Sequence, residues 1–427
     1  MLLRLIKAGV SLLALGLNCP SQSPSNTCND VFNSLSPIPG NAEPGMAEPL
    51  VLGPMIWAVV GGATIYPVEG LDAKIHLAYE VAYTATALPL QVETIDVVDA
   101  HTNMPAGTNH VLSIKNENIT SLARHYPFPQ AGTLDKTEFS SHFAAGQTGF
   151  VYFDVVFDHR DQVPDAIAHR IKISFKGADG KETEMSIVGS ITRVSCSRAV
   201  ILSPPLRGSG WLNGNGCCLE IGPHRAVLLP ANGTLRPAEH FAIDFVKLNH
   251  EGLAFHDDPR KSENWFCYGS EVVAAASGIV VEAVDQYDNQ IPNQPAVNVT
   301  AVNAAGNHVI IDMGAGHYAL YAHLAPHSVS LSLGQYVRQG ARIGLIGNTG
   351  SSTAPHLHFQ VMNRPSALDA YGLPFLFDQF QYRGSLQANL ADLDDLVSKG
   401  KVIALDSKGS GVKTEVMPLS RSLMDFN

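Results

Sequence analysis

Histidine and aspartate residues that could share a chemical task are concentrated in three short segments of the second half of the chain. His240 and Asp244 are four residues apart, His356 and His358 are two residues apart, and His323 stands alone between these pairs. In an extended chain, residues two or four positions apart project from the same face of the strand. His240 can therefore share a target with Asp244, and the two imidazoles of His356 and His358 can project together.

This set of nitrogen and oxygen donors is typical of a catalytic zinc site. Two histidines and one carboxylate, with a fourth position open to water, form such a site, and zinc lowers the pKa of the bound water to about 7. A hydrolase that cleaves amides also needs a base for the water and a donor for the oxyanion, which the remaining imidazoles can provide. A closed structural zinc site would leave these additional histidines without a role. Taken singly, the spacing of His240 and Asp244 also occurs by chance, and His356 and His358 also fit a pair of exposed strand histidines.

The order of the motifs resembles that of a known family, the lysostaphin-like zinc metallopeptidases, which cut peptide bridges of bacterial peptidoglycan. That family has H-x-x-x-D, then a Tyr-x-His-Leu strand, a glycine-containing run and H-x-H. Here the Tyr-x-His-Leu strand is residues 321–324, and the glycine-containing run is residues 334–350, GQYVRQGARIGLIGNTG. Residues 306–312 also match a strand of the family, so the resemblance spans roughly residues 220–380 with every motif in order.

Position by position, the resemblance implies a zinc site and a catalytic pair. It implies that His240, Asp244 and His358 bind zinc. It further implies that His323 and His356 act on the substrate, one activating water and the other stabilising the tetrahedral intermediate. The resemblance does not say which of the two performs which step.

Some positions depart from the family pattern. Ala242 stands where the family often has Gly, and Ala354 and Gln360 replace the commoner Gly and Glu around H-x-H. Residues 249–269 look like an insertion after the first motif. These departures concern the shape of the groove and the substrate rather than the metal ligands. Tyr321 is expected either to line the groove or to pack in the core.

Most other histidines are interpreted as incidental. Those of the first half are predicted to lie on the surface or in turns: His76, His101, His110, His125, His142, His159 and His169. No role is assigned to His250, His256, His308, His317 and His327. His224 and Arg225 are expected to be structural or to line the groove.

Short strands separated by turn residues fill most of the chain, which favours a mainly β fold. The clearest are residues 73–83, 92–98, 150–157, 169–175 and 184–194, followed by 271–284, 308–313, 318–323, 341–346 and 356–362. The first group predicts an N-terminal immunoglobulin-like β-sandwich. The resemblance implies that the second group forms a lysostaphin-like antiparallel β-sheet peptidase domain of the duplicated hybrid motif type.

The predicted organisation has six parts. They are a signal peptide (1–17), a linker (18–48), the sandwich (49–198), a Gly- and Pro-rich connecting segment (199–237), the peptidase domain (238–385) and a C-terminal tail (386–427) that contains a short helix at residues 386–397. The basic start and the apolar run of residues 8–17 predict the signal peptide, with a lipid anchor at Cys19 as the alternative. No other segment is long and apolar enough to span a membrane. The protein is therefore expected in the periplasm or secreted.

The cysteines fit an exported protein, in which disulfides can form. Cys217 and Cys218 are adjacent and are expected not to bridge each other, because neighbouring cysteines fit disulfide geometry badly. One of them pairing with Cys196 or Cys267 is the expected arrangement. No C-x-x-C spacing indicates a cysteine-rich zinc site.

Composition excludes one class of function and the motifs favour another. The chain has 28 Lys and Arg against 39 Asp and Glu, a net charge of −11, which argues against nucleic-acid binding. The sequence predicts an exported zinc metalloendopeptidase that hydrolyses cross-links or stem peptides of bacterial peptidoglycan. The alternatives are a non-catalytic wall-binding protein on the same fold and a zinc peptidase that acts on other exported proteins. The sandwich is expected to position or restrain the peptidase, and residues 203–235 are expected to cover its groove.

Overall fold

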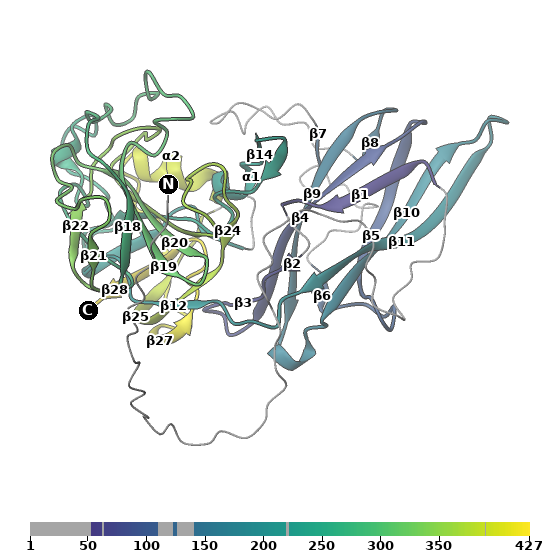
Figure 1. Ribbon diagram of the computed structural model, residues 1–427, viewed down its shortest axis with the longest axis horizontal. Coiled ribbons are helices and arrows are strands. Elements are labelled where there is room, and N and C mark those ends of the chain that lie inside the picture. Colours follow the sequence, from purple (N-terminus) through teal and green to yellow (C-terminus); the bar gives the residue numbers. More distant parts are fainter. Residues whose placement is uncertain (1–52, 62–63, 110–122, 126–140, 219–221, 389) are drawn as a thin grey trace, which may run out of the picture.

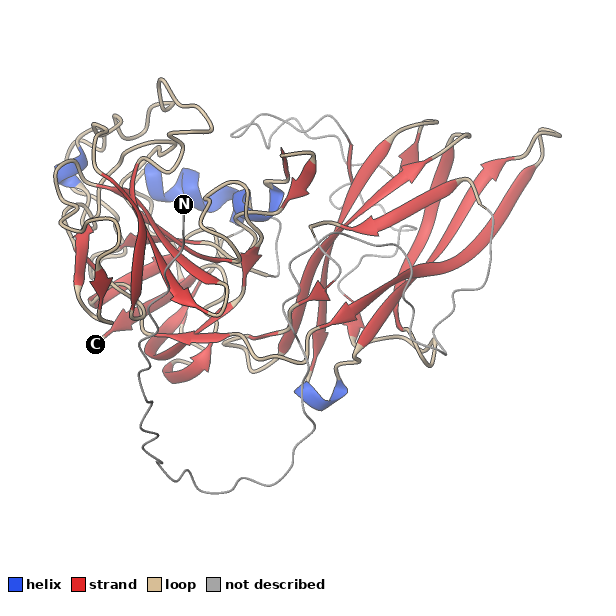
Figure 2. Cartoon of the chain, in the orientation of Figure 1, coloured by secondary structure: helices blue, strands red, loops and turns tan. Residues whose placement is uncertain are grey.

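The computed structural model describes residues 53–61, 64–109, 123–125, 141–218, 222–388 and 390–427. Figures 1 and 2 show a molecule built almost entirely of strands, with a few short helices, in two halves that lie side by side. The predicted mainly β fold is confirmed. The predicted signal peptide and linker, together with Cys19, Cys28 and His110, lie outside the described residues.

The N-terminal half consists of two sheets around one core. The first has the order β1-β4-β9-β6, with β3 beside β4 and β7 beside β9, and the second has the order β2-β11-β10-β5-β8. Their bounds are β1 Met55–Val59, β2 Thr64–Ile65, β3 Val68–Glu69, β4 Ile75–Ala85, β5 Leu90–Asp99, β6 Thr108–Asn109, β7 Ala123–His125, β8 His142–Phe143, β9 Thr148–Phe157, β10 Ala166–Lys176 and β11 Glu182–Val194. A 3-10 turn, Arg160–Gln162, joins β9 to β10. Side chains of both sheets share a hydrophobic cluster that includes Phe153 and Ile171.

Strand β4 separates this core from the other half of the molecule. Leu77, Tyr79 and Val81 alternate along the strand and are buried in the cluster between the two sheets. Ala78, on the opposite face of the strand, belongs instead to the hydrophobic cluster of the C-terminal half. Glu80 shares that second face, so β4 carries one carboxylate directly into the contact between the two halves.

The C-terminal half is built on a 13-stranded sheet. Its main path is β12-β25-β28-β13-β16-β23-β20-β19-β18-β21, with β24 beside β23 and with β26 and β27 beside β25. The bounds are β12 Val200–Leu202, β13 Gly208–Asn213, β16 Ile243–Lys247, β18 Gly278–Val284, β19 Asn307–Gly314, β20 His317–Leu324, β21 Tyr336–Val337, β23 Leu357–Met362, β24 Gly372–Leu373, β25 Phe375–Leu386, β26 Leu405–Asp406, β27 Gly411–Val416 and β28 Ser422–Phe426. Two small antiparallel pairs accompany it: the hairpin of β14 Leu229–Ala231 with β15 Thr234–Arg236, and β17 Glu271–Val273 with β22 Arg342–Leu345. The helical pieces are α1 Pro223–Ala226, a 3-10 turn at Ser262–Asn264 and α2 Leu390–Ser398.

Three features differ from the predicted organisation of this half. The C-terminal tail is part of the sheet, because β28 lies between β25 and β13. The segment predicted only to connect the halves supplies β13, which pairs with both β16 and β28. The predicted strand 271–284 is two strands in different sheets, since β17 pairs with β22 and β18 belongs to the large sheet. Between them the amide of Ala275 donates to the hydroxyl of Tyr321 at 2.8 Å.

The cysteines do not pair as expected. A disulfide joins Cys217 to Cys218, and Cys267 is a buried free thiol that donates to the carbonyl of Pro355 at 3.0 Å. Cys196 is also disulfide-bonded. The expectation that neighbouring cysteines avoid each other and pair with Cys196 or Cys267 was therefore wrong.

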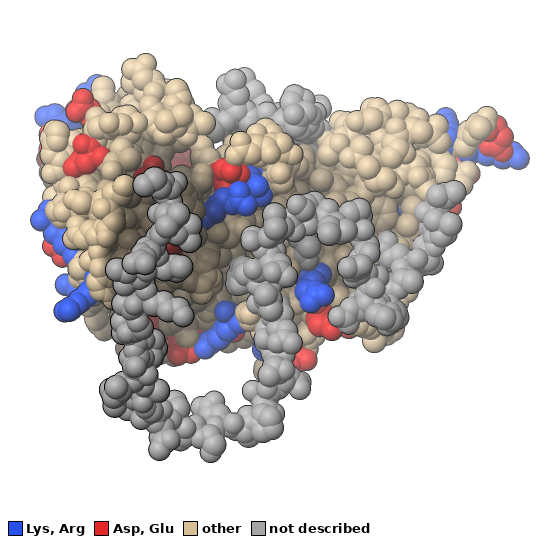
Figure 3. All heavy atoms as spheres, viewed as in Figure 1, with Lys and Arg blue, Asp and Glu red and all other residues tan. Residues whose placement is uncertain are grey.

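Two surface properties agree with the sequence. Charged side chains are sparse on the face shown in Figure 3, as expected from a charged fraction of 16%. Within the described ranges, no helix is long and apolar enough to cross a membrane.

Candidate metal centre

Three adjacent strands bring the predicted residues together. Strand β16 pairs antiparallel with β23, and Asp244 lies directly opposite His358 in this register. On its other side β23 pairs with β20, where Ala322 lies opposite His358. His323 follows Ala322 with a positive φ of 62°, a conformation uncommon for residues other than glycine. His356 immediately precedes β23. Four of the five predicted site residues therefore meet at one end of these strands.

Asp244 is the centre of the cluster. Its Oδ1 lies 3.0 Å from Nδ1 of His358 and 3.3 Å from Nε2 of His356. Its Oδ2 lies 3.1 Å from Nε2 of His224 and accepts a hydrogen bond of 2.7 Å from the amide of Asn215. The carboxylate is thus surrounded by three imidazoles and one amide.

Each of these imidazoles is fixed from its outer side by an oxygen acceptor. His224 Nδ1 is 3.1 Å from the carbonyl of Ala242, and His356 Nδ1 is 2.7 Å from the carbonyl of Ala354. His358 Nε2 is 2.8 Å from Oε1 of Gln360. A carbonyl or amide oxygen only accepts hydrogen bonds, so the ring nitrogen that faces it, the outer nitrogen, carries the proton. In a neutral ring the other nitrogen, the inner one, then presents its lone pair to Asp244.

The donor set fits a divalent cation. Three lone pairs directed at a carboxylate oppose one another unless a proton or a metal ion lies between them. Ligating atoms of His224, Asp244 and His358 all lie within 4.8 Å of one another, and no other such group of three occurs among the residues that the structure describes. Two imidazoles and one carboxylate, each oriented by an outer hydrogen bond, are the ligands that zinc uses at open catalytic sites.

The predicted catalytic pair lies beside this group. The rings of His323 and His356 are 4.7 Å apart between centroids, and the rings of His323 and His358 are 5.8 Å apart. His323 Nδ1 donates to the carbonyl of Thr349 at 2.7 Å, which leaves Nε2 as its free nitrogen. Two imidazoles are therefore available next to the three candidate ligands.

Electrostatics within the cluster favour an ionised Asp244. Burial alone would raise its pKa, but His224 and His356 hold the pKa of this carboxyl well below its usual value. Burial lowers the pKa of an imidazole, yet Asp244 raises the pKa of His224 to about 9 and also raises that of His356. Burial and the neighbouring rings of His356 and His358 lower the pKa of His323. In the absence of metal the carboxylate therefore retains protons on nearby rings.

The prediction that His240 completes the ligand set does not match this geometry. His240 is 1% exposed, and its Nδ1 lies 2.9 Å from Oε2 of Glu80, a residue of the N-terminal half. The physical reason is the burial of Glu80, which is fully enclosed and has the guanidinium of Arg225 at one oxygen and the ring of His240 at the other. His224 occupies the place beside Asp244 that the H-x-x-x-D spacing had suggested for His240.

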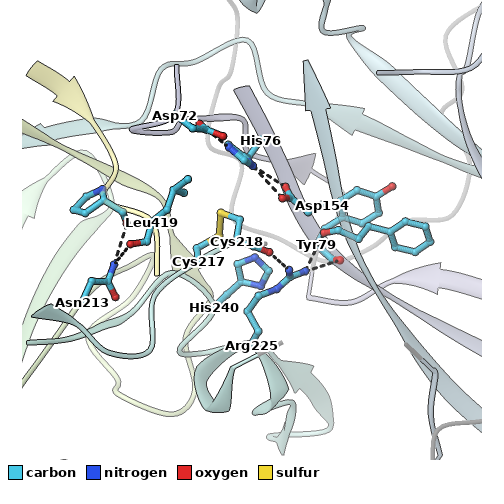
Figure 4. The surroundings of a disulfide bond; sticks show 12 residues. Asp72, His76, Tyr79, Asp154, Asn213, Cys217, Cys218, Arg225, His240 and Leu419 are labelled. Atoms are coloured by element: carbon cyan, nitrogen blue, oxygen red, sulfur yellow. Dashed lines mark hydrogen bonds and ion pairs between the residues drawn. A yellow bond between two sulfur atoms is a disulfide. The ribbon is translucent and has the colours of Figure 1, made fainter. Parts of the chain in front are cut away.

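Arg225 explains why His224 reaches Asp244. Its guanidinium contacts Oε1 of Glu80 through Nε and Nη2 at 3.2 and 3.1 Å. It also donates to three backbone carbonyls, those of Cys218 at 2.7 Å, Phe153 at 2.9 Å and Tyr79 at 3.4 Å. Figure 4 shows this side chain between the Cys217–Cys218 segment and the strands of the N-terminal half, with His240 next to it. Helix α1 is thereby fixed at the contact between the halves.

His224 was missed as a candidate ligand because no local signal identifies it. It precedes Arg225 in a helix of four residues, and its role depends on a contact between Arg225 and Glu80, residues separated by 145 positions in the chain. Asn215 was missed for the same reason. Gln360 had been noted only as a departure from the family pattern, although it orients His358.

Other side chains near the site are structural or form the surroundings of the groove. Tyr321 is fully buried and its hydroxyl accepts from the amide of Ala275, which favours core packing over groove lining. Leu393 anchors α2 in the core, and the carbonyl of Ser398 at its end accepts from Asn293. This helix therefore connects the C-terminal segment to the loop that precedes β19.

Two histidines of the N-terminal half are buried, contrary to prediction. His76 is fully enclosed, with Nδ1 3.0 Å from both oxygens of Asp154 and Nε2 3.2 Å from Asp72. His169 is equally buried and its Nε2 lies 3.0 Å from the hydroxyl of Tyr79. In the C-terminal half, the side chain of His250 is 89% exposed, in keeping with the absence of a role.

The comparisons with known proteins place the similarity in this half of the chain. Residues 264–370 match peptidase family M23. The chain is 42% identical over 66 residues to the peptidoglycan DD-endopeptidase ShyA of Vibrio cholerae, covering 16% of this chain and 15% of that protein. It is 38% identical over 153 residues to lysostaphin of Staphylococcus simulans, covering 36% of this chain and 22% of that protein.

One solved structure similar to this chain is the catalytic domain of lysostaphin from Staphylococcus simulans. The identity is 28%, the match covers 38% of this chain and 88% of that domain, and the TM-score is 0.22. The chain spans less than a quarter of the length of the curated relatives ShyA and lysostaphin.

Proposed function

Because the chain contains a lysostaphin-like domain of peptidase family M23, we propose that it is a zinc metalloendopeptidase that hydrolyses peptide bonds of bacterial peptidoglycan. The observation that carries the proposal is the arrangement around Asp244. Three imidazoles, each oriented by an outer acceptor, direct their inner nitrogens at this one carboxylate. The names of the relatives, a peptidoglycan DD-endopeptidase and lysostaphin, support the choice of substrate.

In this proposal His224, Asp244 and His358 hold the zinc ion. Zinc, when bound, lowers the pKa of a water molecule and polarises the carbonyl of the scissile amide. Asn215 holds Oδ2 of Asp244, and Gln360 keeps the proton of His358 on Nε2, so both ligands are oriented before any metal arrives.

His323 and His356 perform the proton transfers and bind the substrate. The Nε2 atom of one ring, which is neutral, accepts a proton from the attacking water. The other ring, protonated on both nitrogens, donates its Nε2–H to the carbonyl oxygen as negative charge develops there. Their Nδ1 atoms are fixed by the carbonyls of Thr349 and Ala354, which leaves the Nε2 atoms for these steps. The Nε2 atom of His356 lies 3.3 Å from Oδ1 of Asp244. That fixed orientation reduces the reorganisation that the reaction requires.

The finer organisation of the protein is part of the same proposal. Residues 49–198 form an immunoglobulin-like sandwich, and the peptidase domain of residues 238–385 has the duplicated hybrid motif. The enzyme is exported to the periplasm or the cell envelope, in keeping with relatives that act on the wall and with the disulfide of Cys217 and Cys218.

Zinc content and wall digestion test the proposal together. Zinc is measured by elemental mass spectrometry in the full chain, in His358→Ala and in the control His250→Ala, whose side chain is exposed. The same three proteins are incubated with isolated peptidoglycan, and the released fragments are identified by mass spectrometry. We expect one zinc per chain and newly cut peptides for the wild type and the control, and neither for His358→Ala.

Each contrary result would favour a different function for this chain. Full wall digestion by His358→Ala would contradict the zinc mechanism. A wild-type chain that binds zinc and the wall but cuts no peptide would favour a non-catalytic wall-binding protein. Cleavage of other exported proteins without cleavage of wall peptides would favour a peptidase of different substrate.

A further inference from the structure

Two histidines are candidates for one place beside Asp244 and His358. His240 has the spacing to share a target with Asp244, whereas His224 occupies that place in the structure. We propose that Glu80, a residue of the other half of the molecule, is the positioning residue that selects between them. It holds His224 in the metal centre through Arg225 and keeps His240 out by direct contact. This inference rests on the zinc site proposed above.

The first contact of the selection is that between Glu80 and Arg225. The guanidinium is 3% exposed and contacts Glu80 together with carbonyls of β4, β9 and Cys218. Since His224 precedes Arg225 in α1, fixing the arginine on the N-terminal sheet fixes the backbone that presents His224 to Asp244. A residue of the sandwich thus sets the position of a metal ligand in the peptidase half.

The second contact of the selection is that between Glu80 and His240, and it is weaker than the contact with Arg225. The ring is 1% exposed, yet neither of its nitrogens makes a hydrogen bond to any residue in the described part of the chain. Its Nδ1 lies 2.9 Å from Oε2 of Glu80, at an angle that does not form a hydrogen bond. The charge of Glu80 is therefore the main interaction that keeps this imidazole away from Asp244, because an unpartnered buried imidazole gains from any new partner.

The two contacts use different oxygens of one carboxylate. Oε1 receives the guanidinium of Arg225, and Oε2 faces His240. Glu80→Gln can keep the first contact, since an amide oxygen still accepts from Arg225, while its NH₂ group cannot accept from His240. The substitution also removes the negative charge that faces His240. It therefore releases His240 selectively, without removing the acceptor that anchors α1.

The experiment measures which histidine the metal requires. Zinc affinity is determined by chelator competition in the full chain for His224→Ala and His240→Ala, each in the wild-type and the Glu80→Gln background. In the wild-type background we expect His224→Ala to weaken zinc binding by more than about 100-fold, which is more than the loss of a residue that only hydrogen-bonds a ligand. We expect His240→Ala to leave zinc binding unchanged. In the Glu80→Gln background we expect His240 to replace the missing ring. The double variant Glu80→Gln, His224→Ala should therefore bind zinc at least about tenfold more tightly than His224→Ala alone.

A second measurement uses no metal and no substrate. Imidazoles of the metal-free proteins are modified with diethyl pyrocarbonate and located by mass spectrometry. His240 is expected to be protected in the wild type and modified in Glu80→Gln. The control is Asp154→Asn, which removes another buried carboxylate that pairs with a histidine, on the neighbouring strand β9, and is expected to leave His240 protected and the ligand requirement unchanged.

The outcomes separate this inference from the proposed function. If Glu80→Gln leaves His240 protected and leaves His224 indispensable, Glu80 does not select the ligand, whatever the activity on peptidoglycan. If His240→Ala weakens zinc binding as much as His224→Ala in the wild-type background, the selection is also refuted. If the ligand requirement shifts as expected but no wall peptide is cut, the selection stands and the proposed function fails. If Asp154→Asn shifts the ligand requirement as much as Glu80→Gln does, any change at the contact between the halves has this effect, and the assignment to Glu80 is overturned.

Discussion

Two buried carboxylates, Asp244 in the C-terminal half and Glu80 in the N-terminal half, have opposite surroundings. Asp244 is approached by inner ring nitrogens of three imidazoles, all held from outside by oxygen acceptors. Glu80 is approached by a guanidinium and by one imidazole that has no hydrogen bond within the described residues. Lone pairs directed at a carboxylate create a place for a cation, whereas a guanidinium supplies the positive charge itself and leaves no such place.

The surroundings of His76 are a third arrangement that makes the contrast clearer. One imidazole there lies between two carboxylates, those of Asp72 and Asp154, and both ring nitrogens are used. Histidine next to aspartate is therefore not by itself evidence of a metal site. The number of imidazoles per carboxylate and the fixing of the outer nitrogens distinguish the Asp244 cluster from the other two.

The largest effect is expected from Asp244→Asn, which removes the charge at the centre of the cluster. The substitution keeps the shape of the side chain but replaces one ligand oxygen with a group that donates. We expect zinc affinity to fall by more than about 100-fold, beyond the usual loss of an outer-shell partner, measured by chelator competition. Asp257→Asn is the matched control, because Asp257 also contacts a histidine but is 84% exposed. Equal zinc binding by both variants would contradict the role of the Asp244 cluster.

A large loss of stability is expected from Arg225→Ala, which leaves Glu80 as an uncompensated buried charge. Removing one partner of a buried ion pair costs about 3–5 kcal/mol of the free energy of unfolding. The midpoint of urea denaturation should fall accordingly, and zinc affinity should fall with it because α1 loses its anchor. Arg260→Ala, which removes an exposed ion pair with Asp258, serves as the control and should leave the midpoint in place. If Arg225→Ala had the stability of the control, the Glu80 cluster would not join the two halves.

The pH dependence of stability should report the proton that His76 holds between two carboxylates. Burial lowers the pKa of His76, but Asp154 and Asp72 raise it from 6.5 to about 9. Because the pKa in the folded protein lies above that of the unfolded chain, the stabilisation is complete below pH 6.5 and is lost as the pH rises to 9. The difference of 2.5 pKa units corresponds to at most about 3 kcal/mol, since Asp72 is partly exposed.

The comparison for this prediction uses Asp154→Asn. Urea denaturation of the metal-free chain at pH 6 and pH 9 should show a larger loss of stability with rising pH in the wild type than in the variant. An identical pH dependence in both proteins would mean that His76 carries no bound proton near neutrality.

The strands, and the proximity of four of the five candidate residues, could be predicted because their signals are local. Alternating apolar residues predicted β4 within two residues at each end, 73–83 against Ile75–Ala85. Asp244, His358, His356 and His323 lie in or next to strands that pair with one another, so their spacing in the sequence carries over to one end of the sheet. The pleat of a strand converts the pattern of residues directly into a shared face.

The choice between His224 and His240 could not be predicted, because it depends on a contact between distant segments. His240 precedes β16, so the i, i+4 rule for a strand does not fix the direction of its ring. The burial of Glu80 draws that ring away, and Glu80 is separated from Arg225 by 145 residues in the chain. The burial of His76 and His169 was missed for a similar reason, since their partners Asp154 and Tyr79 lie on other strands.

The smallest effect is expected at Gln360, and it tests directly what separates His358 from His240. Both rings are buried, but His358 has an outer acceptor at 2.8 Å and His240 has none among the described residues. Gln360→Leu removes that acceptor, so the proton of His358 is no longer fixed on Nε2 and Nδ1 is no longer reserved for the metal. We expect zinc affinity to fall about 10–100-fold, as for other outer-shell partners, whereas Gln360→Glu should preserve or increase it because a carboxylate accepts more strongly. Wild-type affinity in Gln360→Leu would mean that outer hydrogen bonds do not distinguish the two clusters, and the position of Asp244 alone would have to account for the metal site.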